Sequence, residues 1–563
     1  MKKSYLSWAP FERLLFPPSP TDWLPQGHLA WFILELIDQL DLGVIEGWYQ
    51  SKDPRGQRPY SPKMMTALLL YSYCVGEPSS RQIERLTFED VAYRVLAGGQ
   101  HPDHKSISEF RRQHLDALAK LFYQVLQLCK KAGLVKLGHV ALDGTKVEAN
   151  ASQHKAMSFE RMKATEDRLQ KEIKALLQKA EAVDRSEDSQ FGEQGRGDWK
   201  LEGELARREE RLARIAQARR ELEAEAAAAR ARELMERAEQ AELKARDAWR
   251  RARSPRSEGE ESAGAASQEG GTSPAAHDPV RAPTRAGSRE PDGAVASEGE
   301  ARRATAHAEK VQGQAEQAAE VARDKAAEAG MPEPDLSLRP PEELPRHQVP
   351  NTAEGLPTEK AQRNFTDSDS RIMKRGGEFI QAYNCQAAVD SAHQIIVEIA
   401  TTNQAPDPEH LIPTLSKMKA NFGALPEKLS ADTGYWSDEN AAWCAEQGID
   451  AYIATGRTKH GSPSESESAP VSEPRPPPES APDPPVGKPP PKEVMAAKLK
   501  TEAGRAVYSR RKVIVEPVFG QIKGSTRRLE RFLLRGLEKV TGEWALFCLT
   551  HNILKMYRAK VSG

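Results

Sequence analysis

Three short stretches, far apart along the chain, each place one acidic residue where a shared site would need it. The first is an apolar, β-prone run that ends in Asp143, and the second sets Asp432 between a short β-prone run and a glycine turn. The third, from Tyr508 to Lys523, has helical spacing and contains Glu516. Asp143 and Asp432 are 289 residues apart, and Asp432 and Glu516 are 84 residues apart. If the three acids serve one site, the chain must bring these distant segments together in one core.

Carboxylates that converge from different elements are the ligands that a pair of Mg²⁺ ions, roughly 3.5–4 Å apart, requires. Each acid taken singly also has an ordinary explanation, because Asp-Gly is a common turn signal. The three contexts together predict a metal-dependent phosphoryl-transfer site that is formed by Asp143, Asp432 and Glu516 and holds two Mg²⁺ ions. Mn²⁺ is the expected substitute.

The longer sequences around these acids are Val140-Ala-Leu-Asp-Gly-Thr-Lys-Val-Glu-Ala-Asn150, Ala431-Asp-Thr-Gly-Tyr-Trp-Ser-Asp-Glu-Asn440 and Tyr508-x2-Arg511-x4-Glu516-x6-Lys523. Through these motifs the chain resembles bacterial insertion-sequence transposases of the DDE class, over residues 10–155, 360–460 and 493–558. Many such transposases read Tyr-x2-Arg-x3-Glu-x6-Lys in the third motif. Here the spacing from arginine to glutamate is one residue longer, which leaves Arg511 and Lys512 as alternatives for the arginine position.

The resemblance implies an RNase H-like catalytic domain that cleaves and joins DNA at the ends of its own insertion sequence. It implies catalytic and metal-binding roles for the three acids, and DNA contacts for Tyr508, Arg511 and Lys523. The implied partner is double-stranded DNA, both element ends and target, and a homodimer is expected on DNA because two ends must be held at once. Two alternatives are a nuclease of the same fold without strand transfer and a non-catalytic DNA-binding or assembly protein. The presence of all three acids argues against the second.

The carboxyl-terminal part of the chain is strongly basic, although the whole chain has a net charge of −1. From residue 491 to 563 there are 16 Lys or Arg against 6 Asp or Glu. Such an excess suits a polyanion, and nucleic acid is the natural one. Arg527 and Arg528 are the expected phosphate contacts there. A solvated basic helix without a partner is the alternative.

Residues 10–135 read as short helices separated by tight turns, with arginines near helix starts. This arrangement is compatible with a helix-turn-helix-like DNA-binding module, in which Arg111 and Arg112 contribute to recognition of the element ends. The alternative is a helical scaffold whose arginines are merely solvated.

The segment after the first acid reads as an insertion. Apolar residues at helical spacing, with abundant Glu and Arg between them, predict two antiparallel helices in a coiled coil over residues 155–253. The following stretch is rich in Gly, Ser and Pro, so a mostly disordered linker is expected over 254–359. Residues 461–492 read as a second disordered linker, rich in Pro and Ser.

The predicted fold class is α/β, with a mixed-sheet RNase H-like core, an all-helical N-terminal domain and a helical coiled-coil insertion. The core is assigned to residues 136–154, 360–460 and 493–558. Five cysteines without CxxC spacing predict neither a zinc site nor a disulfide framework. No apolar signal core or stretch of ~18 apolar residues is present, so a bacterial cytoplasmic, nucleoid-associated protein without membrane contact is expected.

Overall fold

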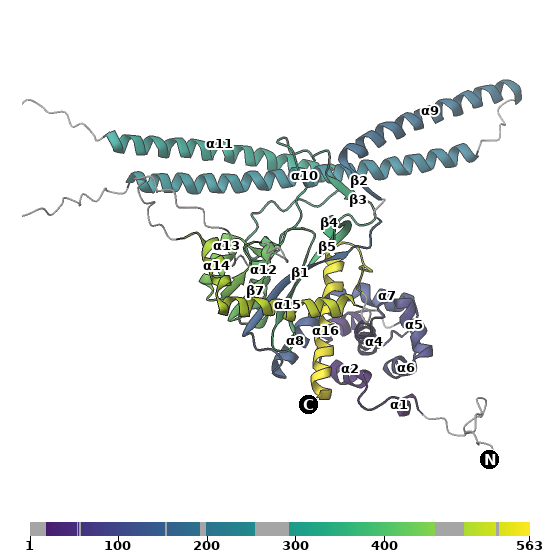
Figure 1. The fold of residues 1–563 in the computed structure, drawn as a ribbon. Helices are drawn as coiled ribbons and strands as arrows, with labels where there is room; N and C mark the ends of the chain where they lie inside the picture. Colours follow the sequence, from purple (N-terminus) through teal and green to yellow (C-terminus); the bar gives the residue numbers. More distant parts are fainter. Residues whose placement is uncertain are drawn as a thin grey trace, which may run out of the picture. The chain divides into compact units, whose positions relative to one another are not determined.

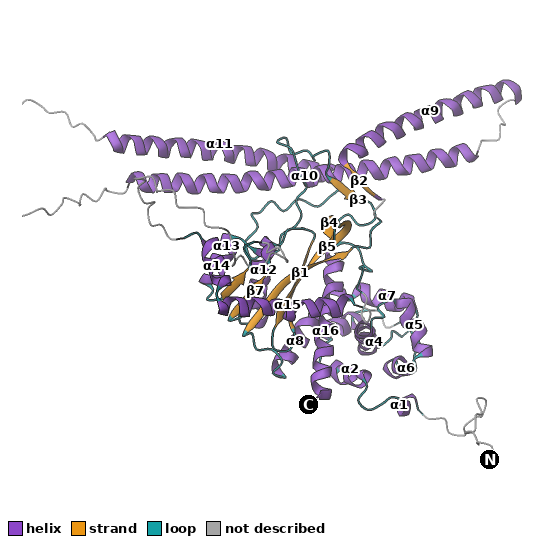
Figure 2. Cartoon of the chain, viewed as in Figure 1, coloured by secondary structure: helices purple, strands orange, loops and turns teal. Residues whose placement is uncertain are grey.

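The computed structural model describes residues 19–52, 55, 58–152, 155–191, 199–253, 292–456, 489–524 and 529–562. These residues form two compact units. The first contains residues 1–156, 339–347 and 364–563, and the second contains residues 157–338 and 348–363. Figures 1 and 2 show a sheet with its helices in the first unit and long paired helices in the second.

The first unit is built on a six-stranded mixed sheet with the strand order β4-β5-β1-β7-β8, and β6 pairs with β5 beside that path. Antiparallel pairing joins β5 to β1, β4 and β6, whereas β7 runs parallel to both β1 and β8. The strands are β1 (His139–Glu148), β4 (Arg371–Arg375), β5 (Glu378–Asp390), β6 (Ile396–Thr402), β7 (Lys428–Ala431) and β8 (Asp450–Ile453). The expected mixed α/β core is confirmed.

Helices follow the strands and cover the sheet (Figure 1). Those after β6 are η2 (Pro408–His410), α12 (Leu411–Phe422), η3 (Thr433–Tyr435), α13 (Asp438–Glu446), α14 (Pro491–Lys500), α15 (Glu502–Lys523) and α16 (Leu537–Ser562). The join between α14 and α15 is tight, because a Cβ at Gly504 would lie 2.0 Å from the Lys498 carbonyl oxygen. Only glycine fits there, and it fixes the direction in which α15 crosses the sheet.

The N-terminal segment is helical, as expected. Its helices are α1 (Pro20–Trp23), α2 (Leu29–Ile37), α3 (Gly43–Gln50), α4 (Pro62–Val75), α5 (Ser80–Glu89), α6 (Val91–Leu96), α7 (His104–Gln113) and α8 (Leu115–Lys131). They share one hydrophobic core with the sheet, because α16 packs on α4, α8 and β6. The approach of α16 to α8 is close enough that a Cβ at Gly542 would meet Leu115 Cγ at 2.6 Å.

The second unit contains a small two-stranded sheet and three long helices. These are β2 (Ala156–Ser158), β3 (Gln362–Asn364), α9 (Phe159–Phe191), α10 (Trp199–Arg253) and α11 (Asp292–Glu328). At 1.5 Å per residue, the 55 residues of α10 extend about 80 Å. Its first half packs antiparallel to α9, through Leu169 and Ile215, as the sequence predicted.

The second half of α10 packs antiparallel to α11, and this pairing corrects the expectation of a mostly disordered linker over 254–359. A run of small side chains closes the contact, including the buried Ala231 and Ala322. Alanine offers little area to bury, but it lets two backbones approach closely and favours helix strongly. Residues 254–291 of that segment, and 457–488 of the second expected linker, lie outside the described residues.

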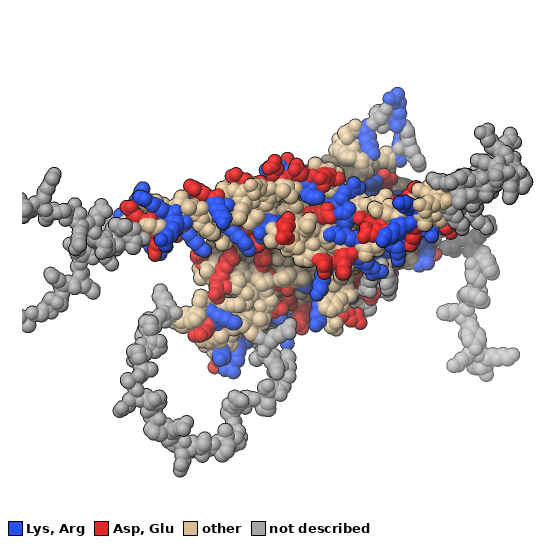
Figure 3. All heavy atoms as spheres, turned by 90° about the horizontal axis from the view of Figure 1, so that it is seen from above, with Lys and Arg blue, Asp and Glu red and all other residues tan. Residues whose placement is uncertain are grey.

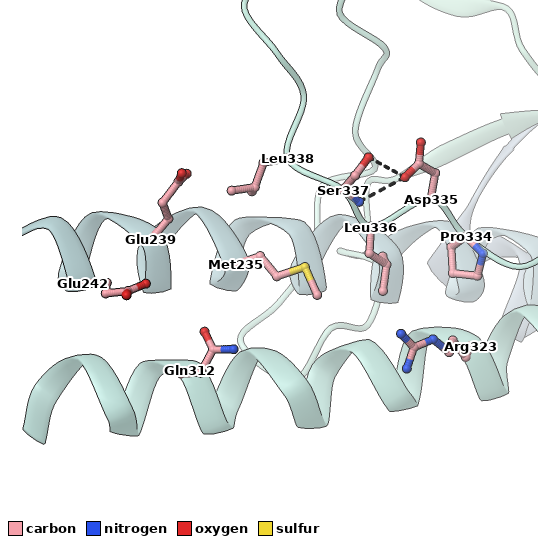
Figure 4. A pocket seen from close by; sticks show the side chains of 10 residues that line it. All are labelled: Met235, Glu239, Glu242, Gln312, Arg323, Pro334, Asp335, Leu336, Ser337 and Leu338. Atoms are coloured by element: carbon pink, nitrogen blue, oxygen red, sulfur yellow. Dashed lines mark hydrogen bonds between the residues drawn. The ribbon is translucent and has the colours of Figure 1, made fainter.

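The long helices carry intermixed charge of both signs, and blue and red side chains alternate along them in Figure 3. Many of these charges pair one turn apart, as Arg237 does with Glu233 at 2.6 Å. A pocket of about 550 Å³ opens between α10, α11 and the segment 334–338 (Figure 4). At its rim Asp335 accepts hydrogen bonds from the Ser337 amide and hydroxyl groups.

No helix among the residues that the structure describes is both long and apolar enough to cross a membrane. All five cysteines fall within the described residues, where each is buried and none forms a disulfide.

Candidate active site

Asp143 and Asp432 meet at the point where two neighbouring parallel strands part. The parallel register pairs Leu142 with Ala431, and each acid is the next residue along its strand. The expectation that the first strand ends at Asp143 is wrong, because β1 continues to Glu148 along β5. The neighbouring strand β7 does end at this level, where the chain turns into η3. Asp143 therefore lies on β1 just beyond the end of its pairing with β7.

Local hydrogen bonds hold both carboxylates. Asp432 begins η3 and accepts a hydrogen bond from the Gly434 amide at 2.9 Å. Asp143 accepts one from the Gly144 amide, also at 2.9 Å. A Cβ at Gly144 would lie 2.6 Å from Gln386 Nε2, so glycine at this position leaves room for the Gln386 side chain from β5.

Burial makes Asp143 electrostatically unusual. Its side chain is 17% exposed, and burial raises its pKa from 3.8 to about 6. The negative charge of Asp432 raises the pKa further, whereas the guanidinium of Arg511 opposes the shift. Because the folded-state pKa is raised, ionised Asp143 lowers stability as pH rises from about 4 to about 6, and that cost persists at higher pH. A bound cation would relieve it.

Arg511 brings the third motif to these acids. It lies on α15, and its Nη1 is 2.8 Å from Asp143 Oδ2, with the Arg511 side chain only 11% exposed. Tyr508 lies one turn earlier on the same helix; burial raises its pKa, and so do the charges of Asp432 and Asp143. Lys512 is exposed, so Arg511 rather than Lys512 faces the acids.

Lys523, near the end of α15, is anchored on β1. Its ammonium group donates to the Thr145 hydroxyl and, at 3.4 Å, to the Lys146 carbonyl oxygen. Burial lowers its pKa, which a freely solvated lysine would not show. The predicted residues Tyr508, Arg511 and Lys523 therefore all lie along one helix that spans the site.

Glu516 is not drawn into the pair of aspartates. It is exposed on α15, five residues beyond Arg511 and seven before Lys523. Among the described residues, no three His, Cys, Asp or Glu side chains lie close enough to hold a metal ion. The structure thus brings two of the three predicted acids together, and the role of Glu516 stays a prediction.

A proline beside Glu516 explains how α15 is tied to the sheet. Pro517 has no amide hydrogen, so the carbonyl of Val513, four residues earlier, lacks its helical donor. Gln394, in the turn between β5 and β6, donates its side-chain amide to that carbonyl at 2.9 Å. This bond joins the middle of α15 to the sheet edge.

The four arginines predicted to bind DNA have different surroundings. Arg111 is 5% exposed, and its guanidinium donates to the Pro78 carbonyl at 2.7 Å and to the Tyr73 hydroxyl at 3.3 Å. This burial contradicts a DNA contact for Arg111, whose role is structural. Arg112 is exposed, 3.4 Å from Glu109. Arg527 and Arg528 lie outside the described residues.

A further acid, Asp407, lies beside the two aspartates and was not among the residues predicted from the sequence. Its Oδ1 accepts hydrogen bonds from Asn384 at 2.7 Å and from Gln386 and Lys146 at 3.0 Å each. Gln386 in turn accepts a hydrogen bond from the Tyr435 hydroxyl. Burial raises the pKa of Tyr435, and the charges of Asp407, Asp143 and Asp432 raise it further, so all three acids lie near that side chain. The only local signal was an acid between two prolines, Pro406 and Pro408.

We expect Asp407→Ala to slow single-turnover DNA cleavage about tenfold to a hundredfold, because hydrogen bonds to a charged group contribute about 1.5–3 kcal/mol each. Asp407→Asn keeps one acceptor oxygen and should lose less. Glu409→Ala, two residues away and paired with Arg339 at 2.7 Å, serves as the control. Wild-type rates for Asp407→Ala would contradict the role of this network.

Comparison with known families agrees with this arrangement. Residues 18–113 match the family described as Transposase domain (DUF772), and residues 352–553 match the Transposase DDE domain. Asp432, Glu516 and all of α15 lie inside the second match, whereas Asp143 lies between the two matches on a strand of the same sheet. No curated protein and no solved structure matches the chain significantly.

The DDE domain implies an enzyme that cleaves DNA and transfers its strands, so DNA is the substrate. Together, the two matched domains place the chain in the DDE transposases, with a DUF772 transposase domain ahead of its DDE catalytic domain.

Proposed function

We propose that this transposase cleaves and joins DNA at the ends of its own insertion sequence, with Asp143 and Asp432 as its metal-holding carboxylates. One observation carries the proposal: two acids 289 residues apart lie at the ends of paired parallel segments, with the guanidinium of Arg511 beside them. Glu516 is proposed as the third acid. It lies about 7.5 Å along the α15 axis from Arg511, at 1.5 Å per residue.

The donor chemistry of this site fits a divalent cation. Both aspartates offer carboxylate oxygens, the ligands that Mg²⁺ and Mn²⁺ prefer, and the raised pKa of Asp143 marks a charge that Arg511 offsets only in part. Two Mg²⁺ ions bound there would activate the attacking water or 3′-hydroxyl and stabilise the leaving 3′-oxygen.

The side chains on α15 are placed to bind the DNA backbone. Arg511 lies beside both Asp143 and Tyr508, so a phosphate bound near the aspartates would meet a positive charge there. Lys523, held on β1, offers an ammonium group farther along the same helix. Tyr508 lies one turn before Arg511, so the three residues can follow one strand past the aspartates.

We further propose that the enzyme acts as a homodimer on double-stranded DNA in the bacterial cytoplasm, bound to the nucleoid. Two element ends must be held at once for strand transfer, and the basic carboxyl-terminal segment suits a polyanion. Mass photometry of a paired-end complex should show two protomers, and a single protomer across both ends would refute the dimer.

The test is a cleavage assay on labelled duplexes that carry the inverted repeats flanking the coding sequence, beside scrambled duplexes. We expect nicking at the repeats and joined products in Mg²⁺ or Mn²⁺, and neither in EDTA. Nicking without joining would favour the nuclease alternative. Binding without nicking in either metal would favour the DNA-binding or assembly protein.

A further inference from the structure

The sheet carries a hairpin that the site described above does not use. It is formed by β4 and the start of β5, which are joined by Gly376 and Gly377. Both glycines have positive φ, 59° and 97°, the left-handed conformation that a two-residue hairpin turn requires. The register pairs Arg375 with Glu378 directly across this turn. The turn therefore fixes which side chains share a face.

The two faces of this hairpin differ sharply. On one face Met373 and Ile380 are buried, with exposures of 1% and 5%. On the other face Phe379 is 69% exposed and Ile372 is 43% exposed. Lys374 lies directly opposite Phe379, and Ile372 is its diagonal neighbour, so the three form one surface. An exposed phenylalanine next to an exposed isoleucine at the edge of a sheet is typical of a surface that binds another molecule.

Two cations lie at the tip of this hairpin, beside the exposed Glu378. Lys374 and Arg375 are both exposed at the hairpin end. Arg375 lies 3.9 Å from Glu148 at the end of β1, and its charge contributes to the lowered pKa of Lys523. The hairpin thus lies on the side of the sheet where Lys523 ends the proposed DNA-binding face of α15.

We propose that the β4–β5 hairpin is a DNA-contacting element, in which Lys374 and Arg375 bind backbone phosphates and Phe379 packs against a base at the element end. The proposal rests on the proposed function, since it assigns the hairpin to the same DNA. Lys374 lies opposite Phe379 on the same face, and Arg375 lies on the other face at the turn, so cations on both sides of the hairpin tip could meet phosphates on either side of a base. Apolar side chains are known to insert between base steps. A second copy of β4 would be a poorer partner, because antiparallel pairing centred on Met373 would place Arg375 of each copy opposite Arg371 of the other.

The test uses the full-length protein and end duplexes that contain 2-aminopurine near the terminus. Phe379→Ala should weaken binding about tenfold and remove the fluorescence change at the base it contacts, whereas Phe379→Trp should retain both. Lys374→Ala/Arg375→Ala should reduce the slope of log affinity against log salt by about two, about one for each phosphate contact. These side chains are exposed, so unchanged thermal unfolding is expected and is checked first.

Two matched controls are available far from the hairpin. Val561→Ala removes another exposed apolar side chain, 62% exposed on α16, and Lys120→Ala/Lys131→Ala removes two exposed lysines from α8. Unchanged fluorescence and an unchanged salt slope in the hairpin variants would overturn the proposal. Loss of self-association with intact DNA binding would overturn it in favour of an interface between copies.

Asp143→Asn, assayed in parallel, separates this inference from the proposed function. If wild type cleaves the ends, Asp143→Asn does not, and the hairpin variants bind like wild type, the hairpin proposal alone fails. If wild type neither binds nor cleaves the end duplexes, the proposed function fails and the hairpin proposal fails with it.

Discussion

Asp143→Asn and Asp432→Asn should each reduce cleavage of element ends by on the order of 10³-fold or more, while end binding stays within about twofold of wild type. Each change removes a negative charge at the strand ends but preserves side-chain volume. A metal at such a site stabilises the transition state by several kcal/mol, and each 1.36 kcal/mol is a factor of ten in rate. DNA docking depends on other side chains, so binding should persist. Rates of nicking in Mg²⁺ and gel shifts at fixed salt measure the two quantities.

Asp438→Asn is the matched control, because Asp438 is an exposed acid six residues after Asp432 in the first turn of α13. Substantial cleavage by Asp432→Asn would count decisively against the assignment. Glu516→Gln completes the series. If it loses cleavage as fully as the aspartate variants, Glu516 is the third acid. If it cleaves normally, the site depends on the two aspartates alone.

The pair of aspartates could be predicted because each lies in a strongly patterned local sequence. The apolar run before Asp143 and the glycine turn after Asp432 determine a strand and its end over a few residues. Which strands become neighbours is a long-range outcome, but parallel pairing of β1 with β7 follows from a common α/β arrangement. The third motif was predictable as a helix, and its Arg511 lies 2.8 Å from Asp143.

The role of Asp407 could not be predicted, because it depends on partners from three other elements. Lys146 comes from β1, Asn384 and Gln386 from β5, and the Tyr435 ring from η3. None is near Asp407 in sequence, and an acid between prolines reads as an ordinary turn. The packing of the long helix α11 could not be predicted for a different reason. Its contact with α10 is made by alanines, which helical pattern analysis does not count as strongly apolar.

Arg111 shows most clearly where pattern reasoning failed. An arginine near a helix end, in a segment of short helices, resembles a DNA contact. The structure instead turns Arg111 inward, near Glu543 of α16, whose carboxylate accepts hydrogen bonds from the amides of Leu533 and Leu534. Burial raises the pKa of Glu543, and the positive charge of Arg111 counteracts that rise. The guanidinium therefore compensates a buried carboxylate across the junction between the N-terminal helices and the sheet.

Arg111→Ala should accordingly lower the free energy of unfolding of the first unit by about 1–3 kcal/mol, because it leaves the half-buried Pro78 carbonyl without its donor and removes the positive charge near Glu543. Arg112→Ala, one residue away and exposed, should change it by less than about 0.5 kcal/mol. Urea unfolding followed by tryptophan fluorescence measures both, since Trp544 is buried in the same core. Glu543→Gln in the Arg111→Ala background should restore part of the loss, because it removes the uncompensated charge. Unchanged stability together with a lost preference for element ends would instead make Arg111 a DNA contact.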